Sequence, residues 1–304
     1  CIRDTAGNLP VASIASGISD GYGQTARVHS NGFEGLREGT TFSCTAMVTV
    51  KDAEGKRPMG WDYTYRRHRA DLDSLEDIAR RARERASLQL GAKAPLTGRY
   101  NVVIENRAVP RMLSALLAPL SGPALQQRRS LWEGRLNTPI ASPLLTIYDQ
   151  PHKVRGIASS LWDGDGFATA KRPLIHEGVL QTYLIDQYYA RKMGVEPTGG
   201  DTHNLEWQLG ESDPASLIAD AGDGIYIDRF LGGNSNQTTG ELSFGCGGRI
   251  IRDGQLAEPF TEGNLSGNLA EVWSRLVSLG NDADPNSSSA CPTCLFENIQ
   301  ISGR

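Results

Sequence analysis

Apolar and polar positions alternate with a period close to two through much of residues 1–70. The alternating positions are rich in β-branched and aromatic side chains, and turns that contain glycine interrupt them, which is typical of β-strands. We expect a hairpin that pairs residues 45–50 with residues 61–66 across a polar loop carrying Gly55 and Pro58. This first part of the chain is therefore predicted to be rich in β-structure.

The period then changes to that of a helix. Ser74 stands three residues before Asp77, a spacing that resembles a capping box at a helix start. The apolar residues that follow at helical spacing are Leu75, Ile78, Ala79, Ala82, Ala86 and Leu90. Gly91 supplies the expected stop. A short linker at residues 93–98 then divides the chain into predicted domains 1–92 and 93–304.

The second domain is predicted to mix short strands with few helices. The expected strands are 100–105, 144–148, 174–176 paired with 179–185, 225–230, 241–252, 255–257 and 295–302. The expected helices are 110–117, a short one opened by residues 212–214, and a last one capped by Asn268 that carries apolar residues from Leu269 to Val277 and closes at Gly280. Because strands and helices are segregated, we expect the α+β class, with mainly antiparallel β-sheets and a few packed helices.

Composition and charge narrow the function classes. Of 304 residues, 39% are hydrophobic and the net charge is −4, which argues against a nucleic-acid partner because phosphate recognition normally needs a basic face. The basic runs at residues 66–69 and 80–85 are better explained as a solvated helix face with interleaved acids. No apolar stretch reaches the roughly 18 residues that a membrane span needs, so no membrane partner is expected.

The chain begins with Cys1, which fits either a lipid-bearing mature lipoprotein or a trimmed chain, and we favour the second. No signal peptide is visible. Five cysteines without a regular framework indicate a reducing compartment such as the cytoplasm. Cys291 and Cys294 form a single CxxC, which supplies two of the four ligands of a structural zinc site, so we interpret them as incidental thiols.

An ordered series of weaker motifs carries a family resemblance. An Asp149-x-Pro turn is followed by DGDGFAT at 163–169, by a hairpin around Glu177-Gly178, and by a tail over 261–303 that ends in LFENIQISG. With SNGFEG and the SLEDIARRARERASLQLGA helix, this series resembles the TldD/PmbA family and, within it, the PmbA (TldE) branch. The resemblance implies a TldE/PmbA-like subunit of a TldD/TldE-type zinc metalloprotease complex that degrades or processes small or unfolded peptides. An N-terminal portion of the family is expected to be absent here.

The zinc motif of the family's catalytic branch is missing. That motif places two histidines around a glutamate on one helix, with a cysteine downstream, but residues 110–136 contain no histidine. His176-Glu177 begins like HExxH, yet Gly178 follows within a predicted hairpin. The resemblance therefore implies a heterodimer in which this chain has no catalytic residue and no metal, and in which a TldD-like partner holds the zinc. The alternative is a non-enzymatic homodimeric binding or assembly protein, similar to a modulator of DNA gyrase.

Other candidate chemistry is weaker. Cys246 between two glycines is either a nucleophile with His203 as its base or a strand cysteine, and we favour the second. Asp163 to Gly166 resembles half a calcium loop without the closing glutamate, so we interpret it as a turn.

The segment 198–206 is a glycine-rich approach to a strand, in a neighbourhood that the resemblance places near the substrate cleft. Because glycine lets backbone come close to an extended peptide, the predicted peptide-binding residues are Gly199, Gly200, His203 and Asn204. A plain structural loop is the alternative.

Overall fold

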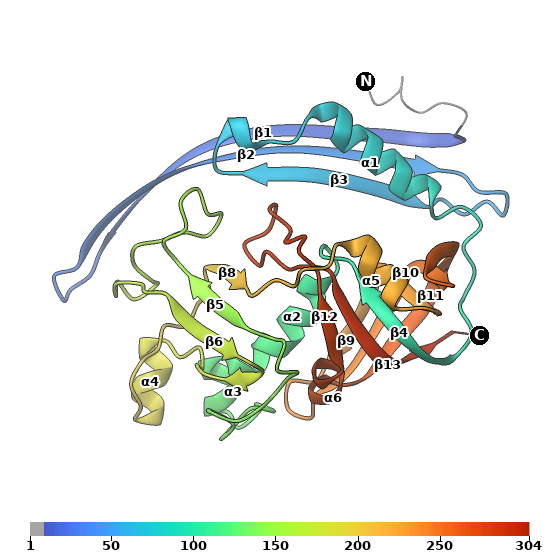
Figure 1. Cartoon of the computed structure of the whole chain (residues 1–304). Coiled ribbons are helices and arrows are strands. Elements are labelled where there is room, and N and C mark those ends of the chain that lie inside the picture. Colours follow the sequence, from blue (N-terminus) through green and yellow to red (C-terminus); the bar gives the residue numbers. More distant parts are fainter. Residues whose placement is uncertain (1–8, 304) are drawn as a thin grey trace. The chain divides into compact units, whose positions relative to one another are not determined.

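Three antiparallel strands form the sheet of the first of two units (Figure 1). They are β1 (Val11–Val28), β2 (Glu34–Val50) and β3 (Met59–Arg66), in the order β1-β2-β3. Thr45 lies opposite Tyr63, so the hairpin predicted over 45–50 and 61–66 is confirmed. The computed structural model describes residues 9–303, and the prediction about Cys1 lies outside them.

Helix α1 (Leu75–Ser87) covers one face of this sheet. The Ser74 hydroxyl accepts the Asp77 backbone N–H at 3.1 Å, which confirms the predicted start of the helix. The helix ends at Ser87, earlier than the predicted stop at Gly91. Its buried side chains pack on strand β2, and together they form a small core of Cys44, Ala46, Val48, Val50, Ile78, Ala82 and Ala86. A 3₁₀ turn, η1 (Arg69–Asp71), precedes the helix.

A six-stranded sheet forms most of the second unit, which holds Ala94–Val154 and the described residues from Ala158 onward. Its order is β11-β10-β9-β4-β13-β12. The strands are β4 (Gly98–Ile104), β9 (Gly224–Ser235), β10 (Glu241–Arg252), β11 (Gln255–Asn268), β12 (Leu276–Leu279) and β13 (Cys294–Ser302). The pair β4–β9 is parallel and the other pairs are antiparallel, which confirms the predicted α+β class.

A smaller antiparallel sheet has the order β7-β6-β5-β8. Its strands are β5 (Ile147–Gln150), β6 (Arg172–His176), β7 (Val179–Leu180) and β8 (Asn204–Trp207). Glu177 and Gly178 join β6 to β7 with φ values of 48° and 76°, so His176-Glu177 lies at a tight turn and not on a helix, as predicted. The strand predicted over 179–185 was too long, because it ends after Leu180.

The helices of the second unit are short. They are α2 (Val109–Leu117), η2 (Ala118–Leu120), α3 (Gly122–Gln126), α4 (Gln187–Met193), α5 (Pro214–Asp220) and α6 (Leu269–Ser274). The prediction of a helix running from Leu269 through Val277 was wrong beyond Ser274. Leu276 and Val277 lie on β12, where Leu276 pairs with Phe296 of β13. Helical spacing of apolar residues could not reveal this pairing, because β13 follows some twenty positions later in the sequence.

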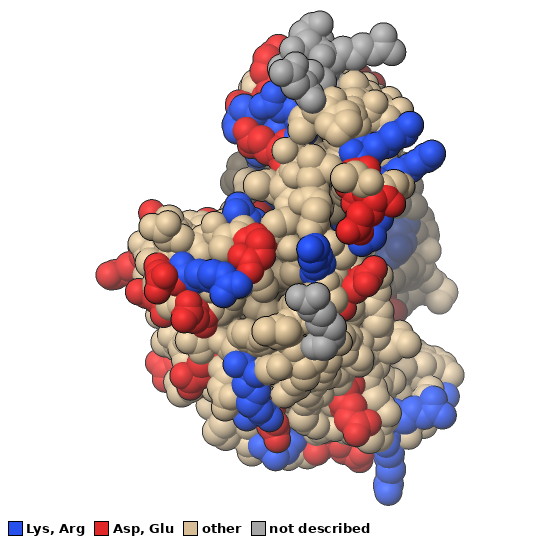
Figure 2. All heavy atoms as spheres, turned by 90° about the vertical axis from the view of Figure 1, so that its right-hand side faces the viewer, with Lys and Arg blue, Asp and Glu red and all other residues tan. Residues whose placement is uncertain are grey.

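One large hydrophobic core holds the second unit together. Its largest fully buried side chains include Trp273, Phe244, Phe260 and Phe296, with Trp273 packed edge-on against Phe296. In residues 9–303 no helix is long and apolar enough to cross a membrane. Acidic and basic side chains are interspersed over the face of the molecule shown in Figure 2.

Candidate functional site

The predicted peptide-binding loop is held in place by a buried ion pair. Asp149 of β5 is 1% exposed, and its carboxylate accepts the Arg172 Nε–H at 3.3 Å. The Arg172 guanidinium also donates to the backbone oxygens of Gly199 at 3.2 Å and Asp201 at 2.6 Å. The other oxygen of Asp149 accepts the backbone N–H of His203 at 2.7 Å. Strands β5 and β6 therefore fix the loop at both of its ends.

The same carboxylate determines which nitrogen of His203 carries a proton. Nδ1 of His203 lies 3.1 Å from Oδ2 of Asp149. An ionised carboxylate accepts hydrogen bonds and cannot donate them, so the proton must be on Nδ1. Within residues 9–303, Nε2 of His203 has no hydrogen-bond partner, and the side chain is 11% exposed. A neutral His203 can therefore accept a hydrogen bond at Nε2, and a protonated one can donate there.

Asn204 makes three hydrogen bonds within the unit. It is buried, and its amide oxygen accepts the Ala158 backbone N–H at 2.9 Å. Its amide nitrogen donates to the Gln150 carbonyl at 3.0 Å and to the Ser159 hydroxyl at 2.9 Å. These bonds fasten the base of the long loop between β5 and β6. The bonds made by Asn204 thus leave its side chain committed to this loop.

The two glycines allow close packing. Gly199 has φ of +86°, a conformation that favours glycine, and a Cβ there would lie 3.0 Å from the Arg172 guanidinium. A Cβ on Gly200 would lie 2.9 Å from Cβ of Asp186, at the start of α4. The edge strand β8 that follows is partly covered, because Leu205 donates its backbone N–H to Ser288 at 2.7 Å. Strand addition at Leu205 would have to displace that bond.

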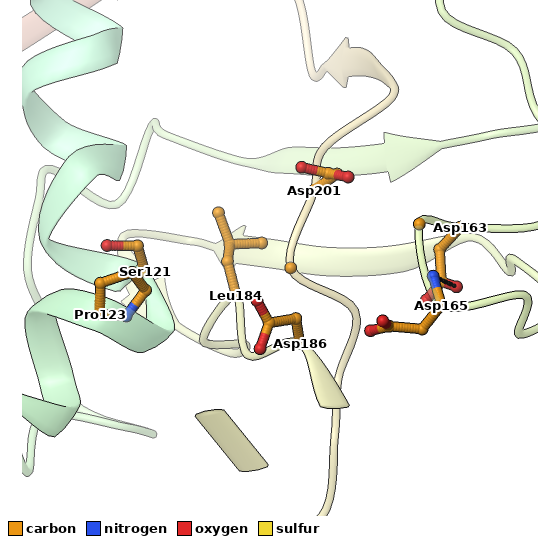
Figure 3. A pocket seen from close by; sticks show the side chains of 9 residues that line it. Ser121, Pro123, Asp163, Asp165, Leu184, Asp186 and Asp201 are labelled. Carbon is orange, nitrogen blue, oxygen red and sulfur yellow. Dashed lines mark hydrogen bonds between the residues drawn. The ribbon is translucent and has the colours of Figure 1, made fainter. Parts of the chain in front are cut away.

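A pocket with an acidic lining opens beside this loop (Figure 3). It has a volume of about 330 Å³. The residues that line it come from four segments and are Ser121, Pro123, Asp163, Gly164, Asp165, Leu184, Asp186, Gly200 and Asp201. Four carboxylates thus surround one cavity, and Gly200 is the predicted site residue that contributes to it.

Three of the four carboxylates also shape the local backbone. Asp163 accepts the N–H groups of Asp165 and Phe167, both at 2.9 Å, which confirms the predicted turn. Asp165 accepts the N–H of Gln187 at 3.0 Å, and Asp186 caps α4 by accepting the N–H of Tyr189 at 2.8 Å. Asp201 is the exposed member of the set. A pocket of this lining suits a small cationic group better than an anion.

The described residues show no metal-binding cluster of three or more His, Cys, Asp or Glu side chains. The histidine-free segment 110–136 folds as α2, η2 and α3 with the loop that follows. The residues present therefore do not fit the zinc site that the family's catalytic branch would require.

The four cysteines within residues 9–303 are buried in the cores. Cys246 lies fully buried in β10, as expected for a strand cysteine, and burial raises the pKa of its thiol to about 12. Burial also raises the pKa of Cys291 and Cys294 well above the ordinary range of a thiol. Because the thiolate is the reactive form, none of the three is suited to act as a nucleophile.

Sequence reasoning missed Asp149 and Arg172. Asp149 was interpreted as part of a turn before Pro151, but it is a residue of β5 whose side chain faces inward. An acid directly after an apolar strand segment was the one available signal. Its partners Arg172 and His203 are 23 and 54 positions away, so their meeting could not be seen in the sequence.

Comparison with known proteins places both units in one family. Residues 3–90 match the PmbA/TldA metallopeptidase central domain, and residues 97–303 match the PmbA/TldA metallopeptidase C-terminal domain. The molecule is thus a pair of metallopeptidase-type domains. The chain belongs to the PmbA/TldA family, which is the TldD/PmbA family that its motifs resembled.

Several curated relatives carry the PmbA name. Metalloprotease PmbA of Escherichia coli O157:H7 is 26% identical over 259 residues, covering 84% of this chain and 57% of the relative. A metalloprotease PmbA homolog of Buchnera aphidicola subsp. Baizongia pistaciae is 29% identical, covering 87% of this chain and 60% of the relative. The chain therefore spans well under two thirds of the length of these relatives.

Solved structures agree with the fold. A proposed modulator of DNA gyrase from Bacteroides thetaiotaomicron is 37% identical with a TM-score of 0.97, covering 100% of this chain and 69% of that chain. TldE from Thermococcus kodakarensis is similar in fold alone, with a TM-score of 0.87 at 22% identity, covering 99% of this chain and 71% of that chain.

Proposed function

We propose that this chain is the PmbA (TldE)-like subunit of a TldD/TldE-type metalloprotease complex, and that it works in the cytoplasm. It contributes to the peptide channel, while the TldD-like partner holds the zinc. One observation carries the proposal: a metallopeptidase-type domain pair lacks a metal-binding cluster throughout residues 9–303. A chain of this kind needs a partner for zinc-dependent peptide hydrolysis.

The role proposed for this chain is binding rather than proton transfer. Gly200 and Asp201 line the acidic pocket, and His203 presents Nε2 from the same loop. The pocket suits the terminal ammonium of a peptide or a Lys or Arg side chain, and Nε2 can accept a backbone N–H. The loop between Gly199 and Asn204 would thus contact small or unfolded peptides during their degradation or processing.

The first experiment tests which subunit holds the zinc and whether cleavage needs both. The chain and a TldD-like zinc protein from the same organism are purified alone and together, and zinc content and cleavage of a fluorogenic peptide are measured. We expect no stoichiometric zinc in this chain, and cleavage that requires both proteins. About one tightly held zinc per chain, or cleavage by this chain alone, would refute the proposal.

A second experiment addresses the pocket. Asp201→Asn removes one exposed negative charge, so KM of the complex should rise for a peptide with a lysine terminus and stay unchanged for its acetylated, neutral form. Asp220→Asn on α5 removes another exposed charge, one outside the pocket, and is the matched control. Equal effects of both variants would show that the pocket does not bind the cationic group. Gly200→Val is a poor test, because its side chain would collide with Asp186.

The second candidate function is a homodimeric binding or assembly protein that is not an enzyme. It is favoured by the similarity to the proposed modulator of DNA gyrase, which covers the whole of this chain. Light scattering of the chain with and without the TldD-like protein distinguishes the two functions. A homodimer that persists in the presence of that protein, without gain of peptidase activity, would support this alternative.

A further inference from the structure

The β1–β2 hairpin continues beyond the rest of its sheet. Strand β3 pairs with residues 42–49 of β2, while β1 and β2 remain paired from the Val11–Val50 pair to the Val28–Glu34 pair. Figure 1 shows this two-stranded ribbon running past β3 and α1. We call residues 18–41 the arm. A two-stranded ribbon without a third layer is marginally stable in water, so its exposed side chains need an explanation.

One face of the arm is apolar. Ile18, Tyr22, Val28 and Leu36 are 75%, 67%, 72% and 63% exposed. Register places Ile18 opposite Cys44, on the face that α1 covers nearer the root of the hairpin, and the other three follow at even spacing on that face. The opposite face carries mainly glycine, serine and threonine. The arm therefore continues the apolar face of the unit's core past the end of the core itself.

Acidic residues accompany these apolar ones. Asp20, Glu34 and Glu38 occupy positions on the same face, where Gln24 donates to Glu38 at 2.9 Å. No Lys or Arg occupies this face within residues 18–41, because both arginines of the arm, Arg27 and Arg37, stand at positions of the other face. The uncovered face is thus apolar and negatively charged.

The part of the same sheet face that α1 covers shows how a helix packs on apolar and acidic side chains. There Ala82 and Ala86 of α1 share one buried core with Ala46 and Val48, and the Arg81 guanidinium donates to the buried carboxylate of Asp62. Helix α1 is amphipathic and carries four arginines and three acidic residues. Helix α1 therefore packs on this face of the sheet with an apolar stripe, and one of its arginines pairs with a carboxylate of the sheet.

We propose that the apolar, acidic face of the arm docks a basic amphipathic helix of a partner chain. The helix would lie on the arm as α1 lies on the root, with its apolar side over Ile18, Tyr22 and Leu36. Its Lys or Arg side chains would reach the acidic residues. A second copy of the arm fits less well, because two such faces would bring like carboxylates together.

The test uses a fluorescent synthetic peptide with the sequence of residues 74–91 of this chain, in which Glu76, Asp77 and Glu84 are changed to glutamine so that the helix is basic. The peptide is added to the full chain. We expect saturable binding by fluorescence anisotropy that weakens at 0.5 M salt. Tyr22→Ser and Glu38→Lys should each weaken binding at least tenfold, one through lost apolar contact and the other through reversed charge. A peptide with every arginine changed to glutamate should not bind.

Thr25→Ala on the opposite face is the matched control and should bind as the unaltered chain does. Circular dichroism verifies that all variants are folded. The proposal is overturned if the unaltered chain does not bind the peptide, or if Thr25→Ala and Tyr22→Ser weaken binding equally. It is also overturned if sedimentation shows a dimer of this chain that Tyr22→Ser dissociates, because a second copy then covers the arm.

Discussion

The two units differ in how completely they bury their apolar residues. The second unit has one large core with fully buried tryptophan and phenylalanine side chains, while the core of the first unit consists of seven small or medium side chains beneath one helix. The arm of the first unit leaves large apolar side chains in solvent. Because stability scales with apolar area removed from water, the large core of the second unit can hold the side chains around Asp149 in fixed positions. The exposed apolar side chains of the arm are instead typical of a surface that binds a partner.

The largest effect should come from the buried ion pair of the second unit. Asp149→Ala leaves Arg172 and the backbone N–H of His203 without their acceptor, which should lower the free energy of unfolding by about 3 kcal/mol. Urea unfolding measures it. Glu206→Ala breaks an exposed pair with Lys171 and should cost less than about 1 kcal/mol. Similar costs for both variants would mean that the pair is not needed to hold the second unit.

The second largest effect on stability is expected where Gly60 of β3 contacts helix α1 in the first unit. A Cβ on Gly60 would lie 2.2 Å from the Ala82 oxygen and from the Ala86 nitrogen. Gly60→Ala should therefore push α1 off the sheet and cost about 2 kcal/mol. Gly23→Ala in the arm meets nothing within 4 Å and is the control. Hydrogen exchange should increase in residues 59–87 and not in the second unit; faster exchange in both units would show that they unfold together.

High pH should weaken the second unit through its buried thiols. Burial raises the pKa of Cys246 to about 12, so the folded chain keeps this proton at a pH where the unfolded chain releases it. The stability contributed by the neutral thiol is present below about pH 9 and declines as the pH rises from 9 toward 12. Cys246→Ala should flatten that decline in urea titrations. A pH dependence identical to that of the unaltered chain would show that Cys246 is not responsible.

The smallest effect is expected in the arm. Tyr22→Ser and Leu36→Ser remove side chains that are already exposed, so each should change the free energy of unfolding by less than about 0.5 kcal/mol. Thermal unfolding measures this change. A loss above about 1 kcal/mol would mean that the arm contributes to the core after all, and the contrast between the two units would disappear.

Local sequence patterns were sufficient to predict structural features that neighbouring residues produce. The Ser74 cap and the turn at Glu177-Gly178 are made by neighbouring residues, and each was found at its predicted place. Helix α5 begins at Pro214, where residues 212–214 were expected to open a short helix. The β10 strand also has the predicted bounds. Such signals act over two to four residues, and a single sequence shows them directly.

Tertiary structure decided the rest, because the relevant partners are distant in the chain. Pairing with β13 converts Leu276 and Val277 from the end of a predicted helix into strand β12. The site depends on Asp149 of β5 meeting Arg172 of β6 and His203 of a loop, and the arm depends on which face α1 leaves uncovered. The segregation of strand and helix patterns along the sequence was enough to predict mainly antiparallel sheets, and turn residues showed where several strands end. Which carboxylate is buried, which histidine nitrogen is presented and which apolar face stays open were settled by long-range packing, whose contacts have no signature in local sequence.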